Sequence, residues 1–171
     1  LNRNFDLIID VFGADHADTY PDVLAALDAL GIDIASIRVL IHQFVTLLKN
    51  GEKVKMSTRK ATFVTLEELI NQVGSDVVRY FFIMRSMNSH LNFDLDLATD
   101  QSENNPVYYL QYAHARICNI IKNGAEKGLS VTGEFDRTLL SDDSAISLIK
   151  FLVEFPEVMV IALKKLEPHG I

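Results

Sequence analysis

A strand–helix–strand pattern near the start of the chain limits its fold more than any other part of the sequence. Residues 6–12 are mostly apolar or β-branched and end at Gly13, which is typical of a buried strand. Apolar residues recur at helical spacing over residues 20–30, and Gly31 stands where a helix C-cap glycine is expected. Residues 37–44 indicate a second buried strand. This order predicts a βαβ unit of a doubly wound parallel sheet.

The next segment combines a turn with two helices. Asn50-Gly51 is a strong hairpin signal after the second strand. Thr65 and Glu68 have the spacing of a capping box, which predicts a helix that ends at Gly74. Ser75 can cap a further helix over residues 76–85, and we expect that helix to be buried because it is apolar nearly all round.

Beyond an acidic and polar segment at residues 94–105, every signal is helical. One helix is expected over residues 106–123 and a second over 142–155, and Pro156 is expected to start a third. Three amphipathic helices make a thin bundle, so we expect further partners for them. The predicted fold class is therefore α/β followed by all-α, with domains at residues 1–102 and 103–171.

The composition is that of an ordinary globular protein, with 49% hydrophobic and 23% charged residues. No apolar run approaches the roughly 20 residues of a membrane span, and the start is unlike a signal peptide. A single cysteine, Cys118, leaves no disulfide framework and fits a reducing, cytoplasmic setting. The first residue is Leu1 rather than methionine, so we expect a longer parent protein.

The tetrapeptide Gly13-Ala14-Asp15-His16 is the first candidate site. Glycine after a strand lets a ligand approach the backbone, and the following helix N-terminus offers free N–H groups. An aspartate at this place can accept hydrogen bonds from ribose hydroxyls. A plain N-cap role for Asp15 is the alternative.

A basic loop is the second candidate site. Residues 49–60 hold five cations and one glutamate in a chain whose net charge is −7. The sequence Lys55-Met56-Ser57 inside this loop provides an ammonium group and a hydroxyl that can hold phosphate oxygens. The alternative, on charge alone, is a solvated surface loop.

Several motifs together resemble the arginyl-tRNA synthetases, a family of class I aminoacyl-tRNA synthetases. Lys55-Met56-Ser57 is similar to the core of the class I signature loop, although Thr58 replaces its second lysine. The resemblance runs in register from about Val11 to Ile120. Its other blocks are residues 51–57, 63–66, 77–86, 90–98 and 105–116, of which the last is the most family-specific. It implies the C-terminal half of a Rossmann-like catalytic domain followed by the first helices of an anticodon-binding domain.

The resemblance also implies roles for individual residues. Lys55 and Ser57 would be catalytic, through contacts to the ATP phosphates. The residues implied in ATP binding are Gly13, Asp15, His16, Gln43, Met56, Arg59 and Lys60. The residues implied in tRNA binding are Gln111, His114 and Arg116. No protein-bound metal site is implied, although Mg²⁺ would accompany the ATP phosphates, and His42 is expected to be a packing residue.

The implied activity of the parent protein is arginine–tRNA ligation, with ATP, arginine and tRNA as substrates. The other class I signature, His-x-Gly-His, and the Asp-Ala-Leu-Arg motif are both missing from the chain, so we expect this piece to be inactive alone. Two alternatives stay open. One is a non-catalytic module that binds RNA or protein. The other is a different adenylyl-transferring enzyme, such as a relative of pantothenate synthetase.

Overall fold

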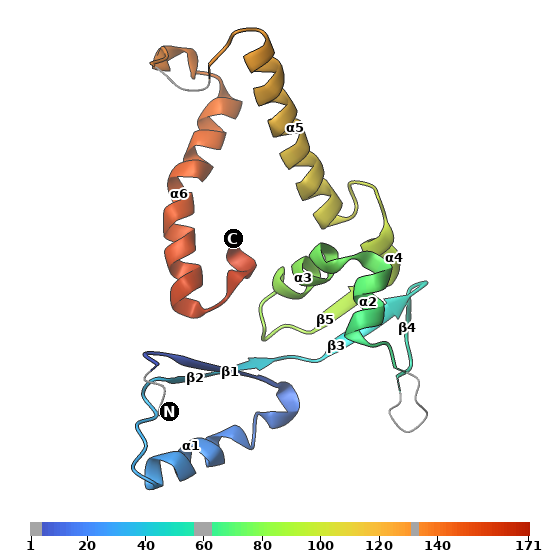
Figure 1. The fold of residues 1–171 in the computed structure, drawn as a ribbon, viewed down its shortest axis with the longest axis vertical. Helices are drawn as coiled ribbons and strands as arrows, with labels where there is room; N and C mark the ends of the chain where they lie inside the picture. The colour runs from blue at the N-terminus through green and yellow to red at the C-terminus, as the bar shows by residue number, and fades with distance from the viewer. Residues whose placement is uncertain (1–4, 57–62, 131–133) are drawn as a thin grey trace.

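The first structural unit is a two-stranded parallel sheet with one connecting helix. The computed structural model describes residues 5–56, 63–130 and 134–171, and Figure 1 shows their arrangement. Strand β1 (Ile8–Gly13) pairs with β2 (Ile37–His42), and α1 (Tyr20–Ala29) links them. The register places Gly13 opposite His42, so both strands end at the same edge. The predicted βαβ unit is confirmed.

The second sheet has three strands in the order β4-β3-β5. Its central strand β3 (Val45–Lys49) pairs antiparallel with β4 (Glu52–Lys53) and parallel with β5 (Leu91–Asp94). Asn50 and Gly51 between β3 and β4 have φ values of 53° and 73°. Two successive positive φ angles are the geometry that an Asn-Gly hairpin turn requires, so the predicted turn is confirmed.

Three short helices cover this sheet: α2 (Leu66–Val73), α3 (Ser75–Ile83) and α4 (Leu95–Thr99). The capping box of α2 is confirmed, because Thr65 Oγ1 accepts the Glu68 N–H at 3.1 Å and the Glu68 carboxylate accepts the Thr65 N–H at 2.8 Å. The prediction that Ser75 caps α3 is wrong. Gly74, with φ of 87°, precedes the helix, and no side chain caps it.

The hydrophobic core lies between β3, β5 and these helices. Phe93 of β5 is fully buried, and its ring centroid lies 5.1 Å from that of Phe81 and 5.9 Å from that of Phe82. The buried cluster consists of Leu47, Leu69, Val78, Phe81, Phe93, Leu95, Ala98 and Val107. The expectation that α3 is buried all round is only partly met, since Val78 and Phe81 are buried whereas Ile83 is exposed.

The C-terminal half consists of two long helices, α5 (Pro106–Glu126) and α6 (Asp143–Lys165), with short 3-10 turns η3 (Arg137–Leu139) and η4 (Pro168–Gly170). Pro156 does not start a third helix, which corrects the prediction, but lies inside α6. A proline removes one donor and crowds the carbonyl four residues earlier, and the hydrogen-bonded turns on both sides of it continue the helix. No helix in the described part of the chain is long and apolar enough to cross a membrane.

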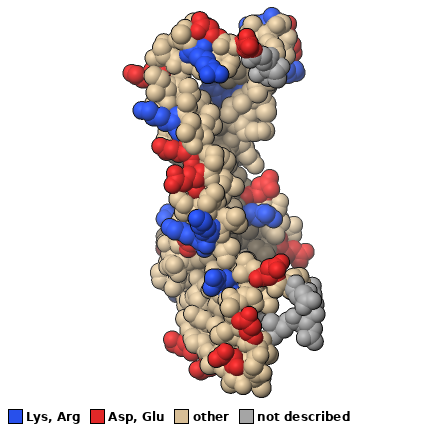
Figure 2. Space-filling model, turned by 90° about the vertical axis from the view of Figure 1, so that its left-hand side faces the viewer, with Lys and Arg blue, Asp and Glu red and all other residues tan. Residues whose placement is uncertain are grey.

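The two long helices diverge in Figure 1 and do not form the expected thin bundle. The only buried residues on them are Val107 and Ala162. Figure 2 shows the α6 side of the molecule, where charges of both signs are scattered over a mostly uncharged surface. Strand β1 is also exposed on its faces, as at Val11, which is 61% accessible, because one helix and one neighbouring strand cannot cover it.

The total accessible surface is therefore large, at 13738 Å² for a chain of 19.2 kDa. A compact folded monomer of this mass exposes about 8,400 Å². Many large apolar side chains are exposed, among them Leu30, Phe151 and Leu163. Large exposed apolar patches typically mark surfaces that a partner or another part of a protein covers.

The acid sensitivity of α6 can be predicted from its N-terminus. Asp142 accepts the N–H groups of Ala145 and Ser144, each at 3.0 Å, and the hydrogen bond from Ala145 lowers the pKa of its carboxyl. A lowered folded-state pKa stabilises the helix above the unfolded-state value and loses this effect as the pH falls through the folded-state value.

We therefore expect the Asp142→Asn variant, whose amide caps without titrating, to lose less helix than the parent chain when acidified below about pH 4. Circular dichroism of both 171-residue chains between neutral and acid pH measures this. Superimposable acid transitions would contradict the assignment of Asp142 as a charged cap.

Candidate functional site

The carboxyl end of β1 places Gly13 and Asp15 in direct contact. Residues Ala14–His16 form the 3-10 turn η1, with Gly13 as its N-cap residue. A Cβ atom on Gly13 would lie 2.6 Å from Asp15 Oδ1, so the carboxylate folds back over the glycine. Gly13 has φ of −70°, a backbone conformation open to any residue, so what a Cβ at this position would require is a shift of the Asp15 carboxylate.

The Asp15 carboxylate does not cap a helix. Neither η1 nor α1 has a side-chain cap hydrogen bond, which removes the simple N-cap interpretation of Asp15. Within the described residues its contact is with His16, whose Nε2 lies 3.8 Å from Asp15 Oδ2, and both side chains are more than half exposed. The carboxylate therefore keeps lone pairs available for a ligand hydroxyl.

His16 and Gln43 lie at the same edge of the sheet but in different surroundings. The His16 ring packs against Phe12 with centroids 5.6 Å apart, and it lines a pocket of about 190 Å³ between β1 and α1. Gln43 follows β2 directly, and its N–H donates to the carbonyl of Met87 at 2.8 Å. The ring centroid of the neighbouring His42 lies 6.3 Å from that of Phe82, as expected of a packing residue.

Lys55 and Met56 lie just after β4, at the exit of the hairpin. The Val54 N–H still donates to the Leu47 carbonyl at 2.9 Å, so the chain is held up to the residue before Lys55. Lys55 and Met56 are both exposed. The other predicted residues of this loop, Ser57, Arg59 and Lys60, lie outside the described residues. In the part of the chain that is described, no hydrogen bond, ion pair or ring contact joins Lys55 or Met56 to the Gly13–His16 turn.

The three residues implied in tRNA binding are all exposed on α5, and they have different contacts. The Arg116 guanidinium lies 5.7 Å from the centroid of the Tyr112 ring, within the range of a cation–π contact. His114 lies one turn before Cys118, with Nε2 3.7 Å from Sγ. At 100° per residue, Arg116 lies on a different side of the helix from Gln111 and His114.

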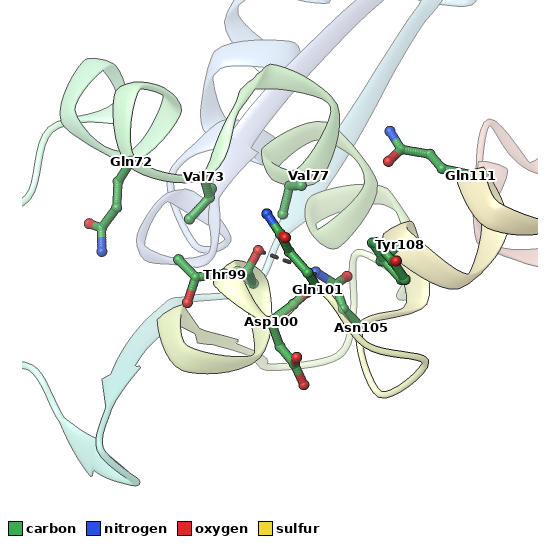
Figure 3. Close-up of a pocket in the computed structure, with 10 residues that line it drawn as sticks. Gln72, Val73, Val77, Thr99, Asp100, Gln101, Asn105, Tyr108 and Gln111 are labelled. Atoms are coloured by element: carbon green, nitrogen blue, oxygen red, sulfur yellow. Dashed lines mark hydrogen bonds between the residues drawn. The ribbon is translucent and has the colours of Figure 1, made fainter.

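Gln111 lines a polar pocket of about 450 Å³ where α2, α3, α4 and α5 meet. Figure 3 shows the amide side chains of Gln72 on α2, Gln101 in the loop after α4 and Gln111 on α5 around it. Val73 and Val77 supply an apolar wall, and Tyr108 closes one side. Sequence reasoning missed this pocket because its residues are dispersed over some 40 positions without a common motif.

Asn105 beside this pocket is a residue whose role the sequence could have indicated. Its side chain accepts the Val107 N–H at 3.0 Å and donates to the carbonyls of Ala98 and Asp100 at 3.2 and 2.9 Å. Asparagine directly before a proline is a standard N-cap signal. The dashed line in Figure 3 marks a hydrogen bond donated by the Asn105 side-chain amide.

Comparison with known proteins shows which families this sequence matches. The family described as "tRNA synthetases class I (M)" matches residues 11–110, and the "DALR anticodon binding domain" matches residues 110–171. The first match includes the Gly13–Asp15 turn and the Lys55 hairpin, and the second includes most of α5 and all of α6.

The chain belongs to the class I tRNA synthetases. Within that class its sequence is similar to the arginine–tRNA ligases. It is 54% identical over 167 residues to the arginine–tRNA ligase of Salinibacter ruber, matching 98% of this chain and 30% of that protein. It is 49% identical over 171 residues to that of Bacillus licheniformis, matching 100% of this chain and 31% of that protein.

A solved structure agrees with the sequence relatives. The crystal structure of a Campylobacter jejuni protein assigned as an arginyl-tRNA synthetase superposes with a TM-score of 0.81 and 29% sequence identity. The match covers 99% of this chain and 36% of that one. The chain thus corresponds to about 30% of the length of the relatives it matches, and the predicted order of a class I catalytic segment followed by a helical domain is confirmed.

The contact between Gly13 and Asp15 generates a prediction for a full-length protein that contains this segment, in which the resemblance implies that Asp15 binds the ribose of ATP. Gly13→Ala would push the Asp15 carboxylate away from its present position. We expect the affinity for ATP to fall about tenfold, because one hydrogen bond to the ligand is lost. Equilibrium dialysis with ATP measures this.

Gly170→Ala is the matched control, since a Cβ there meets nothing within 4 Å. Equal ATP affinity of the Gly13→Ala protein and the control would show that Asp15 is not a ligand-binding group.

Proposed function

We propose that the protein containing this chain is an arginine–tRNA ligase. It would join arginine to ATP as arginyl-adenylate, release pyrophosphate and then transfer the arginyl group to tRNA. The observation that carries this proposal is the similarity to arginine–tRNA ligases over 98% or more of the chain, at 49–54% identity. The chain is one segment of that protein and is proposed to be inactive alone, because it corresponds to less than a third of the relatives.

In this proposal the chain provides one side of the ATP site. Gly13 allows close approach to the backbone, and the exposed Asp15 carboxylate accepts hydrogen bonds from the ribose hydroxyls. His16 and Gln43 border the same site. Met56 would lie near the adenine through its backbone.

The basic loop would act on the phosphates. When the arginine carboxylate attacks the α-phosphorus, the bond to the bridging oxygen breaks and negative charge grows on the leaving pyrophosphate. Lys55 and Ser57 are proposed to hold these oxygens, with Arg59 and Lys60 supplying part of the charge of the missing second signature lysine. Groups that bind this charge stabilise the transition state more than the ground state.

Mg²⁺ is proposed to enter with ATP. Among the described residues no group of three or more histidines, cysteines, aspartates and glutamates lies close enough together to hold a metal ion. The phosphate oxygens themselves are hard ligands that Mg²⁺ prefers. A bound Mg²⁺ would neutralise phosphate charge.

The arginine pocket is proposed to lie outside this segment.

The helical half is proposed to contact tRNA, with the domain boundary between residues 102 and 103. Gln111, His114 and Arg116 on α5 are the proposed contact residues. The pairing of Arg116 with the exposed Tyr112 ring supports this assignment, because an arginine stacked on an aromatic ring is suited to an RNA base and phosphate. We also propose a cytoplasmic location, where tRNA and ATP are available.

A second candidate function is a non-catalytic module that binds RNA or protein through α5 and α6. The exposed apolar faces of these helices favour it, since Leu148, Phe151, Leu152 and Leu163 are each more than half accessible. The third candidate, another adenylyl-transferring enzyme with a similar loop, is disfavoured by the match of residues 110–171 to an anticodon-binding domain.

The role of Lys55 can be tested in the full-length synthetase. We expect Lys55→Ala to slow adenylate formation by a factor of about 10² to 10³ with little change in the KM for arginine, because the lysine acts on the leaving phosphates. Arginine-dependent exchange between pyrophosphate and ATP measures this step.

Lys53→Ala is the matched control, because Lys53 is an exposed cation two residues earlier on β4. An unchanged exchange rate for Lys55→Ala would remove Lys55 from the catalytic groups. Absence of arginine-dependent exchange in the unmodified protein would refute the proposed ligase.

The role of Arg116 is tested separately by tRNA binding. We expect Arg116→Ala to weaken tRNA binding about three- to tenfold and to reduce the dependence of binding on salt by about one released counterion. Filter binding over a range of salt concentrations measures both quantities. Lys122→Ala on the same helix is the control, and an identical salt dependence for Arg116→Ala and the control would exclude a specific phosphate contact by Arg116.

A further inference from the structure

The end of α6 turns back and makes a long-range hydrogen bond to the other half of the chain. Leu166 adopts the left-handed conformation, with φ of 56°, and the Glu167 N–H then donates to the Ala162 carbonyl at 3.0 Å. This reversal directs the Glu167 side chain toward Ser86, whose hydroxyl donates to the Glu167 carboxylate at 3.2 Å. The two residues are 81 positions apart.

The Glu167 carboxylate is held by more than one contact. Its side chain is only 18% exposed, and its Oε2 lies 3.7 Å from His169 Nδ1. Lys165 and His169 line a hollow of about 210 Å³ with it, beside Ala162, the one buried residue of α6. In Figure 1 the C-terminal turn lies next to the loop that follows α3.

Ser86 in turn organises the loop at residues 84–90. Its carbonyl accepts the Ser89 N–H at 3.0 Å, and its hydroxyl accepts the Asn88 N–H at 3.4 Å. The next residue, Met87, offers its carbonyl to the N–H of Gln43 at 2.8 Å. The loop therefore connects Glu167 to the residue that follows β2.

Gln43 lies at the proposed ATP edge. It follows His42, which stands opposite Gly13 in the parallel pairing of β1 and β2. The path from Glu167 to Gly13 thus consists of two hydrogen bonds, two peptide links and one strand pairing. Each step is short, and displacements of about 1 Å at a reacting site can change rates by up to 10²-fold.

We propose that Glu167 and Ser86 are positioning residues that hold the loop at residues 84–90, and through Met87 the backbone of Gln43, at the ATP edge of the sheet. The end of the helical half is thereby coupled to nucleotide binding without touching the nucleotide. This inference rests on the proposed function, in which Gly13, Asp15 and Gln43 border the ATP site.

The test is a double-mutant cycle in the full-length synthetase. Ser86→Ala and Glu167→Ala are each expected to raise the KM for ATP in arginylation by about three- to tenfold, with the dissociation constant for tRNA unchanged. The double variant is expected to match Ser86→Ala, because either change breaks the hydrogen bond between the two residues and Ser86→Ala also removes the acceptor of the Asn88 N–H. Glu167→Gln, which keeps an acceptor oxygen, is expected to restore the parent KM.

Glu157→Ala, which removes an exposed acidic side chain from α6, is the control for loss of charge. Independent effects that multiply in the double variant, a Glu167→Gln variant as impaired as Glu167→Ala, or a change in tRNA binding alone would each overturn the proposal. A parent protein that arginylates no tRNA would instead refute the proposed function, and this inference with it.

Hydrogen exchange supplies a readout that needs no activity. Glu167→Ala is expected to speed exchange of the Gln43 amide about threefold or more, while the Val54 amide, which bonds to Leu47 in the hairpin, stays unchanged. Equal exchange of the Gln43 amide in the parent and variant proteins would show that Glu167 does not stabilise the hydrogen bond from Gln43 to Met87. The proposal would then be wrong, whatever the kinetic result.

Discussion

The direction of the helical half depends on the buried side chain of Asn105. It is 3% exposed and is the only buried polar residue among those the structure describes. Each of its side-chain hydrogen bonds joins a different part of the junction: the end of α4, the loop after it and the first turn of α5. Leaving such a group unpaired would cost about 1–3 kcal/mol, so α5 is held in one direction relative to the core. Val107, the buried residue of α5, follows two positions later.

Much of the fold could be predicted because its signals are local. The Asn50-Gly51 turn, the Thr65–Glu68 box and the βαβ unit each depend on residues close in sequence, and all three are present. Strand β5 was not predicted, although Leu91 and Phe93 alternate with Asn92 and Asp94, because a strand of four residues gives too short a pattern. The continuation of α6 through Pro156 could not be predicted, since one lost hydrogen bond competes with the remaining turns of a 23-residue helix.

The candidate site also has a local part that the sequence indicates and a long-range part that it does not. The contact of Asp15 with Gly13 spans two residues, and a Gly-x-Asp pattern after a strand is a visible signal. The hydrogen bonds from Gln43 to Met87 and from Ser86 to Glu167 span 44 and 81 positions, and no periodicity or motif indicates them. They arise from the way β2, the loop after α3 and the end of α6 meet. Tertiary contacts of this kind need the structure, because one sequence without its fold specifies no long-range neighbours.

The two proposed parts of the ATP site, the Gly13–Asp15 turn and the loop after Lys55, are connected through two consecutive strands. Strand β2 ends at His42, β3 begins at Val45 in line with it in Figure 1, and the tight turn at Asn50 returns the chain through β4 to Lys55. Asp96 accepts the Asn50 N–H, and β3 pairs with the buried strand β5, so this hairpin is anchored to the core. The β1–β2 unit, by contrast, is covered by one helix only. The lysine proposed to bind phosphate therefore follows a hairpin that is anchored to the buried core, whereas the turn proposed to bind the ribose depends on contacts such as Gln43–Met87 to keep its place relative to that core.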